Sequence, residues 1–112
     1  MTRYVVDANI AAKWFLDEEH AVIARRLGNG QDELIAPDFI CIEVANVLLR
    51  RHRSGGISRA DSDAALTILP TMVRTQSSSP LIRPALALAL AHGRSIYDAL
   101  YVALAARERC PP

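Results

Sequence analysis

The chain has 112 residues, which is enough for one compact domain and too few for two. Its 13 basic and 12 acidic residues give a net charge of +1, which excludes the overall basic field of proteins that hold nucleic acid without sequence preference. Cys41 and Cys110 form no metal-binding pattern with a histidine, so both are expected to be free thiols in a reducing compartment. The longest apolar run, residues 85–91, is too short to span a membrane, and Asp7 interrupts the segment where a secretory signal would run. We therefore expect a cytoplasmic domain.

The first half of the chain alternates short apolar strands with helical patterns. A β-branched and aromatic run at residues 4–6 predicts a buried strand with Asp7 at its carboxyl end. The elements predicted after it are a helix at 10–16, a helix from 17 to about 28, a strand at 34–36 closed by Pro37, and a helix at 38–53 capped by Asp38 and ended by Gly55 and Gly56.

The second half is mainly helical. Ser58 and Asp61 have the spacing of a capping box, which predicts a helix that stops before Pro70. A weak strand at 72–75 and a loop at 77–80 follow. Residues 81–92 alternate alanine and leucine, and because both are strong helix formers we predict a helix ended by Gly93. A last helix runs from Ser95 to about residue 109. Strands separated by helices predict an α/β domain with a parallel sheet flanked by helices.

Three acidic residues occupy positions where a functional role competes with a purely structural one, such as capping a helix or facing solvent. Asp7 follows a buried strand, at the sheet edge where ligands bind, but it would equally serve as a cap for the next helix. Glu43 lies at the margin of the apolar stripe of helix 38–53, and taken alone it is a boundary residue that reaches solvent. Asp98 is the only acid of the apolar last helix before Glu108; a capping role with Ser95 does not exclude metal binding.

Three carboxylates that meet at one sheet edge would suit Mg²⁺ or Mn²⁺, because hard cations take oxygen ligands and keep several waters. Such an ion would activate a water, and a second would stabilise the leaving oxygen of a phosphodiester. Without metal the carboxylates repel one another, so some of their pKa values should rise.

Three segments together resemble, in order and spacing, the successive motifs of PIN-domain ribonucleases, in particular the VapC toxins of type II toxin–antitoxin systems. They are residues 5–10 (VVDANI), 43–48 (EVANVL) and 95–105 (SIYDALYVALA). The resemblance covers essentially the whole chain. It implies a single PIN-like domain over residues 1–112, with a Rossmann-like parallel sheet and helices on both of its faces.

The resemblance also implies an activity, a cofactor and partners. The expected activity is endonucleolytic cleavage of RNA that halts translation, held in check by a cognate antitoxin, in a protein that forms homodimers. Asp7 and Asp98 would bind Mg²⁺ or Mn²⁺, and Glu43 would complete the acidic cluster and position the attacking water. The supporting polar positions of the motifs are Asn9, Asn46 and Ser95.

One departure from the family pattern concerns the C-terminal end. Family members normally continue into another strand that ends in a further Asp, so we expect this chain to be short at the C-terminus, without the last strand or strands. Glu108 should point away from Asp98's end of the helix and so does not replace that acid. The alternative hypothesis is therefore a weak or inactive remnant that binds an antitoxin or another partner. A different phosphoryl-transfer protein with Asp7 as nucleophile ranks last, because position 9 is Asn.

A basic cluster at residues 50–53 ends the helix that carries Glu43. The preferred interpretation is that it complements the helix dipole on a solvated face. The functional alternative is that Arg50 and Arg53 contact the RNA backbone, with Arg94 as a further candidate for phosphate.

Overall fold

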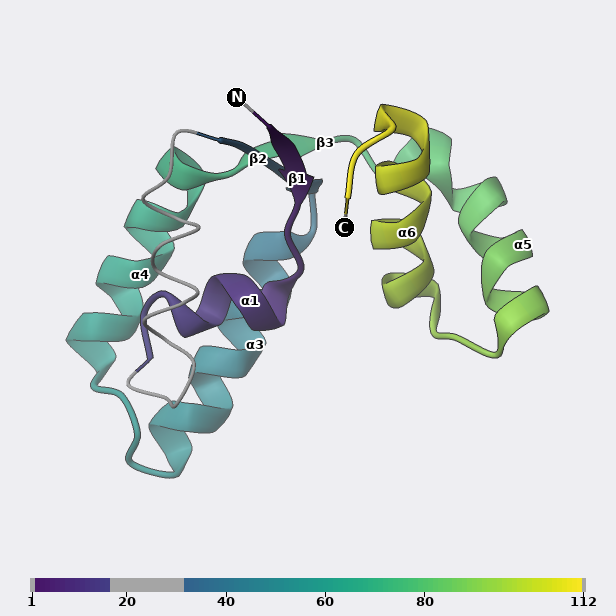
Figure 1. Ribbon diagram of the computed structural model, residues 1–112. Helices are drawn as coiled ribbons and strands as arrows, with labels where there is room; N and C mark the ends of the chain where they lie inside the picture. Colours follow the sequence, from purple (N-terminus) through teal and green to yellow (C-terminus); the bar gives the residue numbers. More distant parts are fainter. Residues whose placement is uncertain (1, 17–31, 112) are drawn as a thin grey trace.

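The computed structural model describes residues 2–16 and 32–111 (Figure 1). It confirms the predicted α/β class: three parallel strands form one sheet in the order β1-β2-β3. Along the chain the elements are β1 (Arg3–Val5), α1 (Ala8–Lys13), β2 (Glu33–Pro37), α3 (Ile40–Arg53), α4 (Arg59–Met72), β3 (Arg74–Gln76), the 3₁₀ helix η1 (Ser79–Leu81), α5 (Ile82–His92) and α6 (Ile96–Glu108).

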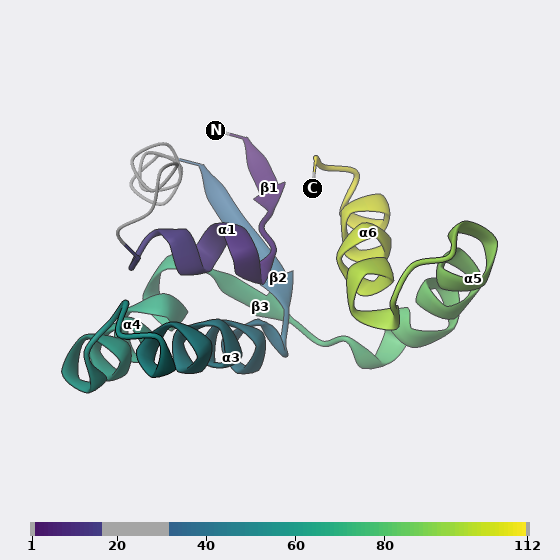
Figure 2. The same cartoon turned by 90° about the horizontal axis from the view of Figure 1, so that it is seen from below.

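Helices cover both faces of the sheet. Helix α1 packs on α3 and α3 on α4, whereas α6 packs on α5 and on strands β1 and β2. Figures 1 and 2 show α1, α3 and α4 on one side of the strands and α5 and α6 on the other. The central strand β2 is buried from Leu34 to Pro37, as its continuous apolar sequence requires. None of the helices in the described ranges is long and apolar enough to cross a membrane.

Helix caps account for several of the boundaries that the sequence predicts. The Ser58 hydroxyl accepts a hydrogen bond from the Asp61 N–H at 3.0 Å, and the Ser95 hydroxyl accepts one from the Asp98 N–H at 3.1 Å. Gly93 ends α5 in the left-handed region, with φ +62°, where a side chain would be strained. The serine caps of both predicted capping boxes and the glycine stop are therefore confirmed.

Two predicted boundaries are wrong. Helix α4 does not stop before Pro70 but continues to Met72, because the buried Leu69 anchors the last turn while the proline ring stays exposed. Asp38 does not cap α3, which begins after Phe39 without a side-chain cap. The Asp38 carboxylate instead accepts a hydrogen bond from the Ser78 hydroxyl at 2.6 Å.

Other predicted element boundaries differ from the structure by a few residues. Helix α1 begins at Ala8 rather than residue 10, because Asp7 caps it. The third strand, β3, is displaced toward Gln76 because Met72 still belongs to α4. The predicted loop at 77–80 includes the start of η1. The helix predicted from residue 17 to about 28 lies outside the described residues.

After α6 the backbone returns to the outer edge of β1. Arg109, at φ 54°, ends the helix, and the Val5 N–H then donates a hydrogen bond to the Pro111 carbonyl at 2.9 Å. In the described part of the chain β1 pairs with β2 and with no other strand. That the domain is short relative to its family stays a prediction.

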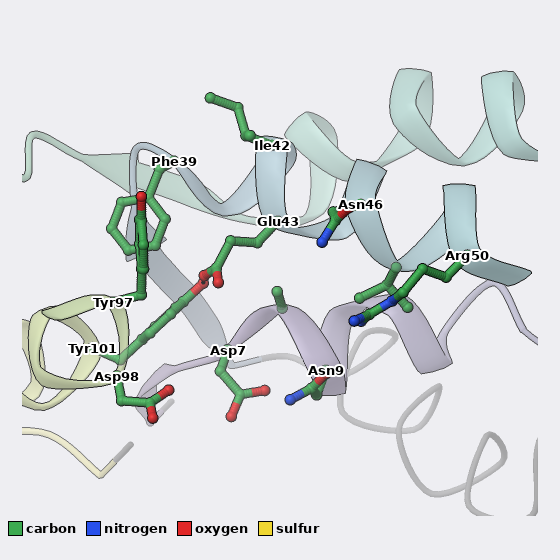
Figure 3. A pocket seen from close by; sticks show the side chains of 12 residues that line it. Asp7, Asn9, Phe39, Ile42, Glu43, Asn46, Arg50, Tyr97, Asp98 and Tyr101 are labelled. Carbon is green, nitrogen blue, oxygen red and sulfur yellow. Dashed lines mark hydrogen bonds between the residues drawn. The ribbon is translucent and has the colours of Figure 1, made fainter. Parts of the chain in front are cut away.

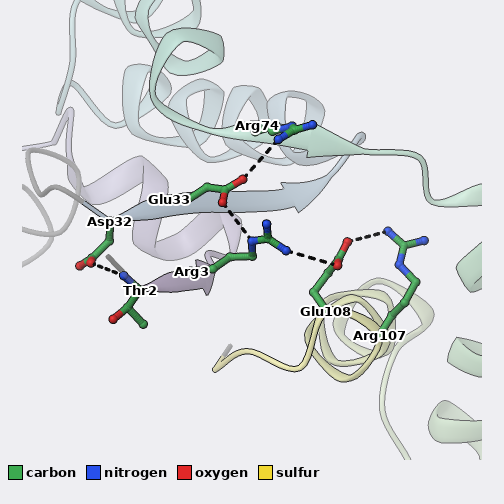
Figure 4. Close-up of polar contacts among 7 residues, drawn as sticks. All are labelled: Thr2, Arg3, Asp32, Glu33, Arg74, Arg107 and Glu108. Atoms are coloured by element: carbon green, nitrogen blue, oxygen red, sulfur yellow. Dashed lines mark hydrogen bonds and ion pairs between the residues drawn. The ribbon is translucent and has the colours of Figure 1, made fainter.

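A chain of charges crosses the sheet at the end where β1 begins (Figure 4). Arg3 pairs with Glu33 on β2 at 3.0 Å and with Glu108 on α6 at 3.5 Å, and Arg74 on β3 reaches Glu33 at 3.5 Å. Because these pairs are solvent-exposed, each stabilises the fold only slightly. They hold Glu108 at the opposite end of α6 from Asp98, as predicted.

Two leucines on neighbouring helices allow a matched test of the packing. Leu104 on α6 is fully buried, whereas Leu90 on α5 is 78% exposed. We expect Leu104→Ala to lower the free energy of unfolding by about 2–5 kcal/mol, because it opens a cavity in the core. Leu90→Ala should change it by less than about 0.5 kcal/mol. Urea unfolding of both variants measures the difference, and equal effects would contradict this placement of α5 and α6.

Candidate functional site

A cleft of about 670 Å³ lies beyond the carboxyl end of β1, between α3 and α6 (Figure 3). This is the edge at which open parallel sheets bind ligands. The structure brings all three predicted acids to this cleft. Its polar lining consists of Asp7, Asn9, Glu43, Asn46, Arg50 and Asp98, and its aromatic lining of Phe39, Tyr97 and Tyr101.

Asp7 reaches the cleft from the short connection between β1 and α1. One carboxylate oxygen, Oδ1, accepts a hydrogen bond from the Ile10 N–H at 2.9 Å, so the capping interpretation is confirmed. The side chain is exposed, and its second oxygen accepts no hydrogen bond within the ranges that the structure describes. A cap uses only part of a carboxylate's accepting capacity, so capping and metal binding are compatible here.

Glu43 projects from the first turn of α3 and is half-buried. Its Oε1 accepts a hydrogen bond from the Tyr101 hydroxyl at 2.7 Å. The interpretation of Glu43 as a boundary residue that simply reaches solvent is therefore wrong. One of its oxygens is fixed by α6, and the carboxylate is held at the cleft.

Asp98 lies in the first turn of α6 and is exposed. The backbone N–H of Asp98, not its carboxylate, contacts the Ser95 hydroxyl. The carboxylate accepts no hydrogen bond from any other described residue, so it stays available for a ligand. Ser95 does not line the cleft; its hydroxyl fixes the start of the helix that presents Asp98.

Tyr101 is the residue of the site that sequence reasoning missed. It is 7% exposed, and burial, followed by the hydrogen bond to Glu43, raises the pKa of its hydroxyl well above the ordinary value of about 10. The hydroxyl therefore remains a proton donor to the carboxylate throughout the physiological range. The available signal was spacing: Tyr101 follows Asp98 by three residues, so both lie on one face of α6.

The metal ligands that the cleft offers fit a hard divalent cation, because its carboxylates all coordinate through oxygen atoms. They do not form a closed cage: among the described residues, no three His, Cys, Asp or Glu side chains lie close enough together to hold one metal ion. Such a set suits an ion that keeps several water ligands and shares its remaining positions with a phosphate, as Mg²⁺ commonly does.

A second cavity of about 570 Å³ adjoins the cleft and shares Asp7, Asp98 and Tyr101 with it. The arginines predicted to contact RNA are placed differently relative to these spaces. Arg50 lines the cleft and Arg94 lines the second cavity, so each of the two spaces that share the aspartates has one arginine in its lining. Arg53 lines neither space and lies exposed in the last turn of α3, which favours the helix-dipole interpretation for this residue.

The amides of Asn9 and Asn46 both line the cleft, as the supporting polar positions predict. Both side chains are exposed, and neither is hydrogen-bonded to another residue of the described segments. They offer free donors and acceptors on the α1 and α3 sides of the acids.

The raised pKa of Tyr101 predicts a pH dependence of stability. Its contribution is fully present below pH 10, where an unfolded tyrosine titrates, and is lost as pH rises toward the higher pKa of the folded state. Between pH 8 and 11 we expect the wild-type unfolding free energy to fall by about 1.4 kcal/mol more than that of Tyr101→Phe. Urea unfolding at both pH values measures this. Parallel slopes for wild type and Tyr101→Phe would contradict the buried hydrogen bond.

Comparison with known proteins shows which family has this architecture. The model of the PIN domain family matches residues 4–111. Ribonuclease VapC3 of Pyrobaculum aerophilum is 35% identical over 106 residues, which cover 92% of this chain and 81% of that protein. The crystal structure of Mycobacterium tuberculosis VapC20, described as a toxin that cleaves the sarcin-ricin loop, has the same fold, with a TM-score of 0.76 over 97% of this chain and 85% of that one at 21% identity. The chain therefore belongs to the PIN-domain family and is VapC-like.

Proposed function

We propose that this protein is a metal-dependent endoribonuclease that acts as the toxin of a toxin–antitoxin pair. The observation that carries the proposal is the meeting of Asp7, Glu43 and Asp98, from three distant segments, at one cleft that an arginine also lines. The ribonuclease named among the relatives supports the same reaction class. A cognate antitoxin, RNA as substrate and a homodimer complete the proposal, on the strength of the family resemblance and of the toxin named above.

In this proposal Asp7 and Asp98 hold Mg²⁺ or Mn²⁺. When bound, the ion supplies Lewis-acid stabilisation of the scissile phosphate and lowers the pKa of a water. Glu43 has one oxygen fixed by Tyr101, so its other oxygen is free to orient the attacking water. The water oxygen bonds to phosphorus as the bond from phosphorus to the leaving oxygen breaks. The attacking water gives up one proton to the solvent, and the leaving oxygen takes up one proton from the solvent.

The remaining polar residues position the RNA. Arg50 and Arg94 flank the acids and can bind phosphates on either side of the scissile bond, because a guanidinium contacts phosphate oxygens in pairs. The amides of Asn9 and Asn46 provide hydrogen bonds to ribose or phosphate oxygens in the same cleft.

The test is cleavage of a structured RNA by the purified protein with Mn²⁺. We expect cleavage to be lost with EDTA and to fall by roughly a hundredfold or more in Asp98→Asn, because the charge that holds the ion is removed. Asp7→Asn is an equally sharp variant: asparagine caps a helix as well as aspartate does, so only the charge is lost. Glu108→Gln, at the far end of α6, is the matched control and should cleave normally.

Circular dichroism of each variant establishes that it is folded. Full activity of Asp98→Asn, or cleavage that persists in EDTA, would contradict the metal site. No cleavage by a folded wild-type protein that still binds a partner would favour the alternative, a partner-binding module without catalysis.

A further inference from the structure

Three aromatic side chains form a wall on the α6 side of the cleft (Figure 3). The Phe39 ring makes edge-to-face contacts with Tyr97 and Tyr101, with centroid distances of 5.4 and 5.5 Å. Tyr101 is buried and engaged with Glu43, and Phe39 is half-buried. Tyr97 is different: its side chain belongs to this packed cluster and is still 54% exposed.

The exposure of Tyr97 is not explained by packing or by hydrogen bonding. Its hydroxyl has no hydrogen-bond partner within residues 2–16 and 32–111. The edge-to-face contact with Phe39 supports the Tyr97 ring at the cleft. Ile42, in the first turn of α3 and 73% exposed, is a further apolar residue that lines the cleft.

The chemistry of the rest of the cleft indicates what such a ring would contact. The aromatic wall meets a lining of carboxylates, amides and an arginine within one space of about 670 Å³. A nucleotide has the same two kinds of surface, because its base has an apolar face and its phosphate is charged. Unpaired bases of RNA bind proteins mainly by stacking on aromatic side chains, while bases inside a duplex are not available for this.

We propose that Tyr97, supported by Phe39, is a base-stacking site for one unpaired nucleotide of the RNA substrate. Tyr97 and Asp98 both lie in the first turn of α6 and line the same cleft, although their side chains point in different directions. A base stacked on Tyr97 therefore lies in the same cleft as the phosphate that the acids face. The proposal requires the nucleotide bound at Tyr97 to be unpaired, because a base inside a duplex cannot stack on a side chain. This inference rests on the proposed ribonuclease function and adds the site that selects the substrate.

The test measures binding rather than cleavage, so that it does not depend on catalysis. Asp7→Asn protein, which keeps its helix cap, is titrated with a hexauridylate that carries the fluorescent base 2-aminopurine at each internal position in turn. A hexamer of the same length without bases is the matched control ligand. We expect 2-aminopurine fluorescence to be quenched at one position, as stacking on a ring requires.

Adding Tyr97→Ala should abolish this quenching and weaken binding of the hexamer about tenfold, the typical effect of removing one stacked ring. Tyr97→Phe should retain both, because it keeps the ring. The hexamer without bases should bind all three proteins alike. Leu90→Ala, at an exposed apolar residue that does not line the cleft, should have no effect.

Three results would overturn the proposal. The first is equal hexamer binding by Tyr97→Ala and Tyr97→Phe. It would mean that the ring does not contact RNA and would favour a protein partner as its contact. The second is an equal loss of affinity for the hexamer without bases. The third is no binding of any hexamer up to about 1 mM, above the range of non-specific affinities. A wild-type protein that shows the quenching and does not cleave RNA would refute the nuclease and leave the stacking site standing.

Discussion

The hydrogen bond from the Tyr101 hydroxyl to Glu43 links two helices that cover opposite faces of the sheet. Helix α3 belongs to one layer and α6 to the other, and the bond joins them just beyond the carboxyl end of β1. A carboxylate acceptor and a buried donor make this a strong contact of its kind, because little water competes for the Tyr101 hydroxyl. The bond holds one oxygen of Glu43 and so orients its carboxylate at the cleft.

Local caps then determine where the aspartates lie. Asp7 fixes the first turn of α1 with one oxygen, and Ser95 fixes the first turn of α6 through the Asp98 backbone. In both cases the group that stabilises the helix leaves carboxylate oxygens free for a ligand. Stability and function therefore do not compete for the same atoms, and an acid can serve as a helix cap and still face a shared cleft.

The sequence predicts those parts of the molecule that depend on local chemistry. The parallel α/β class, the caps at Ser58 and Ser95 and the stop at Gly93 follow from short patterns. The grouping of the three acids did not follow from local patterns; it came from the order and spacing of the family motifs. Tyr101 was missed because its partner lies 58 residues away in the chain, and in sequence a tyrosine in an apolar helix looks like core.

The wrongly predicted helix boundaries also result from contacts that a local sequence pattern does not show. A proline usually ends a helix, but burial of Leu69 holds the last turn of α4 around Pro70. Asp38 has the composition of a cap, and its carboxylate is instead bonded to Ser78, 40 residues further along. In each case a tertiary contact overrides a local preference, and such contacts are not encoded in a short window of sequence.

The central claim is that Asp7 and Asp98 together hold a divalent cation. Calorimetric titration with Mn²⁺ tests it most directly, because it needs neither RNA nor a partner. The wild type and Glu108→Gln should bind Mn²⁺ alike, whereas Asp7→Asn and Asp98→Asn should each bind about tenfold more weakly or worse. Equal affinity in all four proteins, or no binding by the folded wild type, would contradict the account.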